Sequence, residues 1–393
     1  MKLRSGMPGE VGMSAQRLQG VVHAADSWVA QGITPALVLL VARRGVIVLH
    51  EAFGRLTPDD DAPPVKRDTI YPVASLTKPI TATAAMVLVE DGLLGLQRQV
   101  SDYIPEFVAE GKEAVMVHHL LTHTSGLRDE DVVAHVTKKR GLVAIPPPEK
   151  TQHPWIHERL YLSFDAPLWK PPGVEMSYSN HNYALLGEIV RRVSGQSLAD
   201  FARERIFEPL RMEDTFYIVP NAVRTRIVKR ALDAPFAVGV VGPGLGTREH
   251  QELPLAAGGV YSTVMDMAIF GQMFLNRGCY GDVRILSPAA VAEMTRNQIP
   301  GISSQIPGEF FPEASWGFGW SIHGNKKALR YGSLHSQQTF SHHGAGGVQF
   351  WVDPVYEIVG LYFSVALELI DDLRTKECHD LFMNAVTAAA VDG

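Results

Sequence analysis

The sequence has few cysteines, no long apolar run and no excess of basic charge, and each absence excludes a class of protein. Only two of its 393 residues are cysteines, Cys279 and Cys378. They fit no metal-ligand spacing and form no disulfide framework. Because cytosolic proteins rarely contain structural disulfides, we expect both to be thiols in a reducing compartment.

Membrane and nucleic-acid partners are also not expected. The longest apolar run, residues 36–42, is too short to span a bilayer, and residues 1–6 lack the apolar segment of a secretory signal. The formal net charge of −6 gives no electrostatic reason to bind nucleic acid or an anionic membrane. We therefore expect a cytoplasmic protein, and the sequence leaves its oligomeric state open.

The composition is that of a soluble globular protein, with 46% hydrophobic and 20% charged residues. A chain of this length exceeds one small core, so two lobes or one large domain with insertions are expected. Strand patterns lie at both ends, at residues 35–43, 46–52, 348–352 and 358–366. Helices are predicted at 14–31, 76–91, 183–193, 198–207, 263–276, 288–296 and about 372–390.

The order of these elements predicts an α/β (α+β) fold. If the strands at the two ends share one sheet, residues 1–75 and 250–393 form a sheet domain flanked by helices. Residues 76–249 then form a mostly helical domain, with a cleft between the two. The segment 128–172 is rich in proline and aromatic residues, and we expect a long irregular loop there, near the cleft.

The tetrapeptide Ser75-Leu-Thr-Lys78 stands where an apolar helix begins. A serine hydroxyl is a weak nucleophile until a base removes its proton, and residues three apart share a helix face. Lys78 can be that base if burial disfavours its charged form. The alternative is a simple helix cap, because serine is a favoured N-cap residue.

Two further stretches favour catalysis. Tyr178-Ser-Asn180 follows a Pro-Gly turn and offers a phenol for proton relay and an amide for a substrate. His342-His-Gly344 precedes the predicted strand 348–352, and its small residues allow close approach of a substrate backbone. The backbone N–H groups of Ser75 and Ala345 are the candidate oxyanion-hole donors.

These three motifs in this order resemble those of serine β-lactamases and penicillin-binding proteins. The chain is most similar to the class C β-lactamase-like serine hydrolases, which include family VIII carboxylesterases, D-aminopeptidases and D,D-peptidases. The resemblance covers residues 12–390. Supporting stretches are 118–127, 256–263 and 316–320.

The resemblance implies a β-lactamase-like fold: an antiparallel sheet flanked by helices, plus a helical lobe. It also implies acylation of Ser75, with Lys78 and Tyr178 sharing the role of base, and no metal or organic cofactor. Asn180, His342, His343 and Gly344 would contact a small-molecule substrate. Further candidates for substrate contact are Ser125, Trp155, Trp169, Trp316 and Phe318.

One position departs from the family pattern. His342 stands where β-lactamases carry a lysine that binds the substrate carboxylate, and histidine is largely neutral near pH 7. This favours a carboxylesterase acting on short-chain esters, although His343 and Arg330 remain possible anion contacts. A β-lactamase, D-aminopeptidase, D,D-peptidase or acyltransferase stays open, as does a non-catalytic scaffold. His123 is expected to be a structural histidine bonded within a turn.

Overall fold

The two ends of the chain build one sheet. The computed structural model describes residues 1–393 except 60, 232–242, 307–308, 330, 367–372 and 393. Within these described residues the main sheet has seven strands, in the order β1-β3-β2-β13-β12-β11-β10. The strands are β1 (Arg4–Ser5), β2 (Ala36–Arg43), β3 (Val46–Gly54), β10 (Ser321–Ile322), β11 (Phe340–Gly344), β12 (Val348–Asp353) and β13 (Ile358–Ser364).

Strand β2 joins the two ends, because it pairs with β3 on one side and with β13 on the other. All the pairs are antiparallel except β1 with β3, which is parallel. The expected antiparallel sheet is therefore corrected at this one edge. A helix and β2 separate β1 from β3 along the chain, and such a crossover permits parallel pairing.

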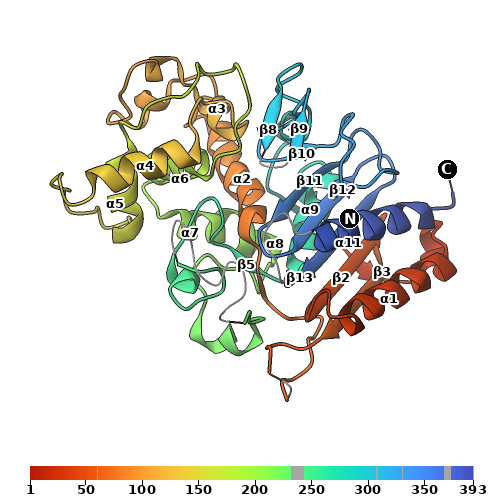
Figure 1. The fold of residues 1–393 in the computed structure, drawn as a ribbon. Coiled ribbons are helices and arrows are strands. Elements are labelled where there is room, and N and C mark those ends of the chain that lie inside the picture. The colour runs from red at the N-terminus through yellow and green to blue at the C-terminus, as the bar shows by residue number, and fades with distance from the viewer. Residues whose placement is uncertain (60, 232–242, 307–308, 330, 367–372, 393) are drawn as a thin grey trace.

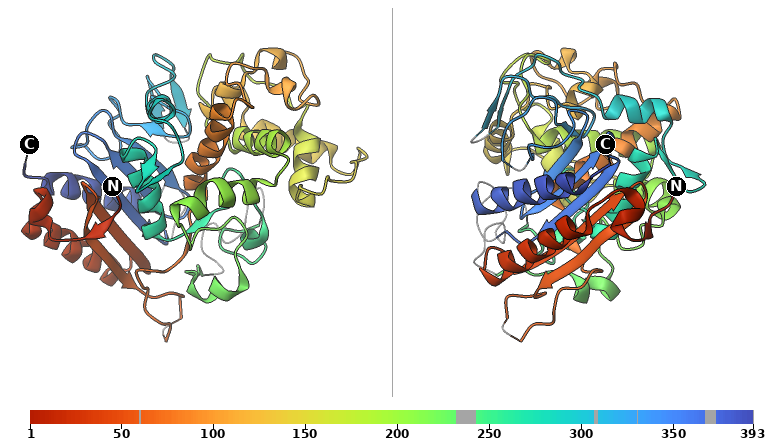
Figure 2. Two further views of the ribbon diagram at one scale, coloured as in Figure 1. Left: turned by 180° about the vertical axis from the view of Figure 1, so that it is seen from behind. Right: turned by 90° about the vertical axis from the view of Figure 1, so that its right-hand side faces the viewer.

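Helices cover both faces of the sheet (Figures 1 and 2). Helices α1 (Ala15–Ala30) and α11 (Leu373–Ala389) lie on one face, and α9 (Val264–Leu275) lies on the other. Leu37, Leu39 and Val41 of β2 belong to the core under α1 and α11, whereas Val38, Leu40 and Ala42 belong to the main core with α9. The unbroken apolar run of β2 is thus buried on both sides.

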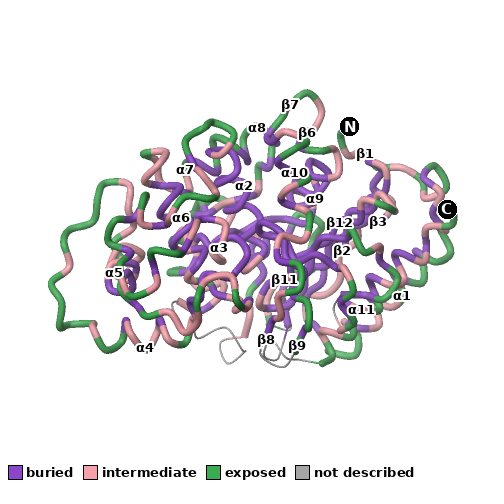
Figure 3. Tube along the Cα trace, turned by 90° about the horizontal axis from the view of Figure 1, so that it is seen from above, coloured by how far each residue is buried: buried purple, intermediate pink, exposed green. Residues whose placement is uncertain are grey.

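The remaining helices gather on one side of the molecule, beside the sheet (Figure 3). They are α2 (Thr77–Glu90), α3 (Val117–Leu121), α4 (Asp129–Lys139), α5 (Pro154–Ser163), α6 (Asn180–Ser194), α7 (Leu198–Ala202) and α8 (Glu208–Leu210), and α10 (Pro288–Met294) follows α9. Short two-stranded ladders pair β4 (Tyr71–Pro72) with β5 (Tyr261–Ser262), β6 (Cys279–Tyr280) with β7 (Val283–Arg284), and β8 (Ser304–Ile306) with β9 (Glu309–Phe311). This mixture confirms the α/β fold class, while the domain boundaries at 75/76 and 249/250 stay a prediction.

The segment 128–172 is not the irregular loop expected from its composition, because it contains α4 and α5. Helix α4 has acidic residues in its first turn and lysines in its last, which complements the helix dipole. Helix α5 begins with Pro154, and the His153 side chain accepts a hydrogen bond from the Trp155 N–H. Local capping therefore overrides the proline-rich composition.

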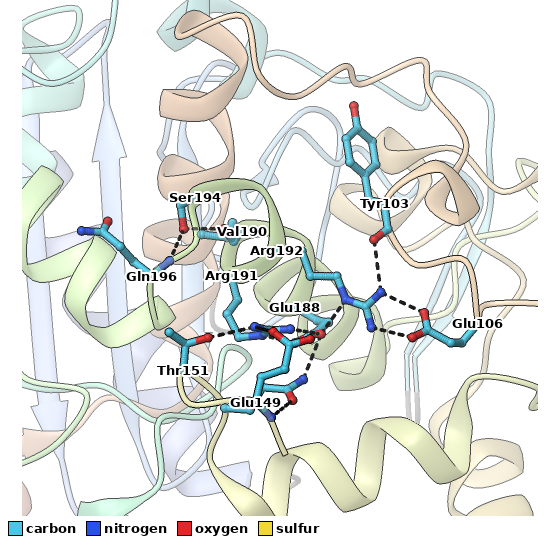
Figure 4. Close-up of polar contacts among 11 residues, drawn as sticks. Tyr103, Glu106, Glu149, Thr151, Glu188, Val190, Arg191, Arg192, Ser194 and Gln196 are labelled. Carbon is cyan, nitrogen blue, oxygen red and sulfur yellow. Dashed lines mark hydrogen bonds and ion pairs between the residues drawn. The ribbon is translucent and has the colours of Figure 1, made fainter. Parts of the chain in front are cut away.

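A charge network fastens this segment to α6 (Figure 4). The carboxylate of Glu188 accepts hydrogen bonds from the guanidinium groups of Arg191 and Arg192. Arg191 also bonds Glu149 and Thr151, which precede α5, and Arg192 bonds Glu106. The network ties two segments, around Glu106 and at 149–151, to the C-terminal half of α6.

Most of the predicted helices match within a few residues. Ser197 caps α7 and Thr263 caps α9, each accepting a backbone N–H three residues on. Helix α6 begins three residues earlier than predicted, so Asn180 is its first residue. Among the described residues, no helix combines the length and apolar character that crossing a bilayer requires.

Candidate active site

Ser75 lies in a turn directly before α2 and does not cap it. The turn is a 3₁₀ helix over Ala74–Leu76, and α2 starts at Thr77. Ala74 has φ 46°, a left-handed conformation that costs a residue with a Cβ about 1 kcal/mol or more. Ser75 is partly exposed, whereas the residues around it are buried. The strained turn thus leaves Ser75 partly exposed within a segment whose other residues are buried.

The Lys78 ammonium lies against Ser75 and is fully buried. Its Nζ is 3.0 Å from Ser75 Oγ, 2.8 Å from Asn180 Oδ1 and 2.9 Å from the Ala257 carbonyl oxygen. No carboxylate is among these partners. Burial lowers the pKa of Lys78 to about 7, although the more distant Asp129 opposes that shift. A sizeable fraction of Lys78 is therefore a neutral amine at neutral pH.

The three partners of Lys78 fix the direction of its lone pair. A neutral amine has two N–H donors and one lone pair. The Ala257 carbonyl and Asn180 Oδ1 can only accept, so they take the two N–H groups. Ser75 is the one partner of the three with a proton to give, so its O–H points at the lone pair. This is the arrangement that a general base needs before it deprotonates a nucleophile.

Tyr178 completes the group around the Ser75 hydroxyl, with which its own hydroxyl shares a hydrogen bond. Lys78 Nζ lies 4.7 Å from the centroid of the Tyr178 ring. Burial raises the pKa of Tyr178 above its ordinary value, and the bond to Ser75 offsets only part of that rise. Tyr178 is therefore a neutral phenol at rest, which leaves the proton-accepting role to Lys78.

Two side chains not predicted at the site hold the Tyr178 segment in place. His123 accepts the Ser179 N–H at its Nδ1, and its carbonyl accepts the Ser177 N–H, so both neighbours of Tyr178 are bonded to it. Its ring also lies 4.5 Å from the Tyr178 ring, centroid to centroid. His123 is thus structural, as expected: its backbone N–H donates to the Leu120 carbonyl within its own turn, and its side chain also bonds a distant segment.

Asp129 is the second of these residues. Its carboxylate accepts from the Ser179 hydroxyl, the backbone N–H groups of Asn180 and His181, and the Asn180 side-chain amide, at 2.6–3.1 Å. It thus caps the N-terminus of α6, a position that favours negative charge. The sequence signal is weak, because a cap supplied from about fifty residues away leaves no local pattern.

His342 lies beside Tyr178 but is not a cation. Burial and the nearby Lys78 lower the pKa of His342 to about 3, so its imidazole is neutral. Its Nδ1 lies 2.7 Å from the His343 carbonyl oxygen, so Nδ1 carries the proton and donates it. Its ring lies 6.1 Å from that of Tyr178 and 5.7 Å from that of Trp316. The third motif therefore supplies no fixed positive charge at His342.

Gly344 brings the third motif against the turn of the nucleophile. A Cβ on Gly344 would lie 2.4 Å from the Val73 carbonyl oxygen, so only glycine fits. The glycine thus makes room for the protein's own backbone, a reason different from the expected approach of a substrate. Ala345 comes directly after Gly344 in the chain. The backbone N–H groups of Ser75 and Ala345 stay the predicted oxyanion-hole donors.

The other predicted contacts divide into two groups. Trp316 packs edge-on against Tyr178, His123 and His342, so it belongs to the site. Trp169 lies between the cations of Arg128 and Lys170, next to the Asp129 segment. His343 is half-buried on β11, next to His342. Arg330 lies outside the described residues.

Ser125 and Phe318 differ from the prediction because both are buried, whereas substrate contact of Trp155 stays a prediction. Ser125 is fully buried and its hydroxyl donates to Asn182 Oδ1, so it anchors the turn to α6 and does not line a rim. Phe318 is 4% exposed and belongs to the main core. Trp155 lies on α5, and the Arg159 guanidinium lies 5.4 Å from the centroid of its ring. Within the described part of the chain, no cluster of three or more His, Cys, Asp or Glu side chains could hold a metal ion.

Comparison with known proteins agrees with this geometry. The family model described as Beta-lactamase matches residues 24–376. A putative D-alanyl-D-alanine carboxypeptidase of Salmonella schwarzengrund is 27% identical over 392 residues, which cover 90% of this chain and 83% of the relative. A penicillin-binding protein homologue from Caulobacter crescentus has the same fold, with a TM-score of 0.76, 22% identity and coverage of 96% of this chain and 99% of that one. A family VIII carboxylesterase has a TM-score of 0.72 at 22% identity, covering 96% and 99% of the two chains.

Proposed function

This chain belongs to the beta-lactamase family, within the β-lactamase-like serine hydrolase superfamily, and on that premise we propose that it is a carboxylesterase acting on short-chain esters through an acyl-enzyme on Ser75. The observation that carries the proposal is the contact between Lys78 and Ser75. A buried lysine with a pKa of about 7 lies 3.0 Å from the serine hydroxyl and has no carboxylate partner. This is how a lysine becomes a base near neutral pH.

The proposed reaction has two steps. Ser75 Oγ attacks the ester carbonyl while its proton passes to Lys78 Nζ, and the Ser75 and Ala345 N–H groups stabilise the oxyanion. The C–O bond to the alcohol then breaks, the Tyr178 phenol gives its proton to the leaving oxygen, and the proton held by Lys78 restores the phenol. Water attacks the acyl-enzyme in the second step, releasing the carboxylic acid and restoring Ser75.

The preference for neutral substrates rests on His342. Its imidazole is uncharged and its Nδ1–H is committed to the His343 carbonyl. An anionic β-lactam or a peptide carboxylate would find no fixed cation at this position, and such a partner normally contributes a strong, charge-assisted hydrogen bond. A neutral ester needs no such partner. The fold of the family VIII carboxylesterase is compatible with this choice.

Peptidase activity is the second candidate, favoured by the 27% identity to the putative D-alanyl-D-alanine carboxypeptidase. Acyl transfer is a variant of the first, since an alcohol can intercept the acyl-enzyme in place of water. A panel of p-nitrophenyl acetate and butyrate, nitrocefin and D-alanyl peptides separates these activities. Turnover of the D-alanyl peptide or nitrocefin without ester hydrolysis would replace the proposal.

A fluorophosphonate probe tests the nucleophile independently of substrate. We expect the probe to label the wild-type protein at Ser75, as seen by intact mass and peptide mapping, and Ser75→Ala to remain unlabelled. Equal labelling of the two proteins, or no labelling of the wild type, would show that Ser75 is not an active nucleophile. Either result would favour the hypothesis that the protein is a non-catalytic scaffold.

A further inference from the structure

Among the described residues, Asp129 is the carboxylate that contacts the segment carrying Tyr178 and Asn180 through several hydrogen bonds, and no motif assigned it a role. It opens α4, whereas the groups it binds open α6. Four donors converge on it: the Ser179 hydroxyl, the Asn180 N–H, the Asn180 side-chain amide and the His181 N–H. Such convergence exceeds what a cap alone requires, because one or two backbone N–H groups suffice for that.

The contact that matters most is the one with the Asn180 side chain. Asn180 Nδ2 donates to Asp129 Oδ2 at 2.9 Å, while Oδ1 of the same amide accepts from Lys78 Nζ at 2.8 Å. A carboxylate is only an acceptor, so the amide must turn its NH₂ side toward Asp129. Its oxygen then faces Lys78 without ambiguity.

The orientation of this amide decides where the Lys78 lone pair points. With Asn180 Oδ1 and the Ala257 carbonyl as acceptors, the lone pair is left for the Ser75 hydroxyl. If the amide flipped, its NH₂ would donate to the lone pair of the neutral lysine. Ser75 would then lose its base, although no residue around Lys78 had been removed.

We propose that Asp129 is a positioning residue, which orients the Asn180 amide and thereby directs the lone pair of Lys78 at Ser75. The inference rests on the proposed function, because it concerns the activation of the same nucleophile. Asp129 forms no hydrogen bond with Ser75 or Lys78, so it acts through Asn180. It also places a negative charge near the lysine, which raises the pKa of Lys78 against the effect of burial.

The groups around these two residues enter the test because they also titrate or carry charge. Lys78 faces Tyr178 and, on α6, Tyr183, while His123 and His342 lie close enough to interact with it electrostatically. Asp129 interacts in the same way with His181 on α6 and with Arg159 on α5.

The test is the rate of fluorophosphonate labelling of Ser75, followed from pH 5 to 9 in the full-length protein. Asp129→Asn is expected to lower the labelling rate about 10- to 100-fold. In a plot of the labelling rate against pH, the acid limb of this variant is expected to move to lower pH, because removal of the negative charge lowers the pKa of Lys78. The matched control is Asp131→Asn, which removes an equal charge from the same first turn of α4. In the wild-type protein the Asp131 carboxylate bonds Arg128. The control variant is expected to keep the wild-type rate and limb.

A double-mutant cycle separates positioning from general destabilisation. If Asp129 acts through Asn180, then Asp129→Asn has little further effect in an Asn180→Ala background, whereas independent effects multiply. Circular dichroism melts show which variants are folded. Asp129→Glu, which keeps the charge but displaces the carboxylate, replaces Asp129→Asn if that variant does not fold; it is expected to be slow with an unmoved limb.

The outcomes distinguish the two proposals. An unlabelled wild-type protein overturns the proposed function itself. A labelled wild type, with a wild-type rate and pH profile in the folded Asp129 variant, overturns only the positioning role. Multiplicative effects in the cycle overturn it as well, because they assign Asp129 to a path that does not include Asn180.

Discussion

The ionisable groups buried at the two ends of helix α6 have opposite kinds of partner. At the C-terminal half, Glu188 is 4% exposed and is paired with two arginines. Burial alone would raise the pKa of Glu188, but Arg191 and Arg192 overcome it and hold that pKa below its usual range. At the N-terminal end, Lys78 meets neutral oxygens, and burial lowers its pKa to about 7. Pairing keeps a buried group charged, whereas an unpaired buried group loses its charge and becomes available as a base.

The largest effect is expected from a substitution that keeps a permanent charge at position 78. Arginine fills similar space and donates hydrogen bonds, but it stays protonated and has no lone pair. We expect Lys78→Arg to lower kcat/KM for p-nitrophenyl butyrate about 10³-fold, mostly through kcat, which steady-state kinetics would measure.

A second buried lysine provides the matched control. Lys112 also has its pKa lowered to about 7 by burial, but its Nζ donates to the Phe164 carbonyl and lies 4.0 Å from the centre of the Phe107 ring. Lys112→Arg is expected to keep wild-type turnover. Equal losses in the two variants would mean that arginine harms the fold and not the base.

The pH dependence is the next largest effect. Since Lys78 accepts the serine proton only as a neutral amine, activity requires pH values above its pKa. We expect kcat/KM to fall about tenfold per pH unit below about 7, and so about 100-fold two units lower. The limb is expected to remain in Lys112→Arg. A rate independent of pH from 5 to 8 would contradict Lys78 as the base.

The sequence reveals the reactive end of this comparison better than its supports. Ser75 and Lys78 are three residues apart in the chain, so their spacing of about one helix turn is a local property that a pattern can predict. Tyr178 and His342 follow from the order of the motifs. Burial lowers the pKa of Lys78, however, and its partners are the Ala257 carbonyl and the Asn180 amide. A backbone carbonyl has no residue type by which a sequence could reveal it.

The other misses have two causes. Helix α4 has a charge pattern at its two ends, but the proline-rich composition of the segment 128–172 favours an irregular loop. For side chains, the cause is contact between distant segments. Ser125 and Phe318 carry side chains typical of a substrate rim, yet the partners that bury them, Asn182 and the main core, come from other elements. What the sequence lacks in each case is the identity of the partner.

At the C-terminal half of α6, where Glu188 is paired with arginines, a substitution is expected to lower stability and not activity. Glu188→Gln removes the charge shared by Arg191 and Arg192, but both arginines keep other carboxylate partners. The loss in unfolding free energy is therefore expected to be about 1–2 kcal/mol, below the 3–5 kcal/mol typical of a fully broken buried pair. Chemical denaturation measures it, with kcat/KM unchanged.

The pH dependence of that loss follows from the lowered pKa of Glu188. The carboxylate stabilises the fold above its unfolded pKa, and this contribution disappears as the pH falls through the folded value. The difference between wild type and Glu188→Gln is thus largest at neutral pH and shrinks in acid. A difference that grew in acid would contradict the pairing.

The same network supplies the smallest effect, because Glu149 bonds Arg191 but is 70% exposed. Solvent screens such a pair, and Arg191 retains Glu188 and Thr151, so Glu149→Gln should cost less than about 0.5 kcal/mol. Chemical denaturation of this variant beside Glu188→Gln measures the effect of burial on one shared cation. Equal losses would mean that the network stabilises by holding residues 149–151 in place, and not by keeping a buried charge paired.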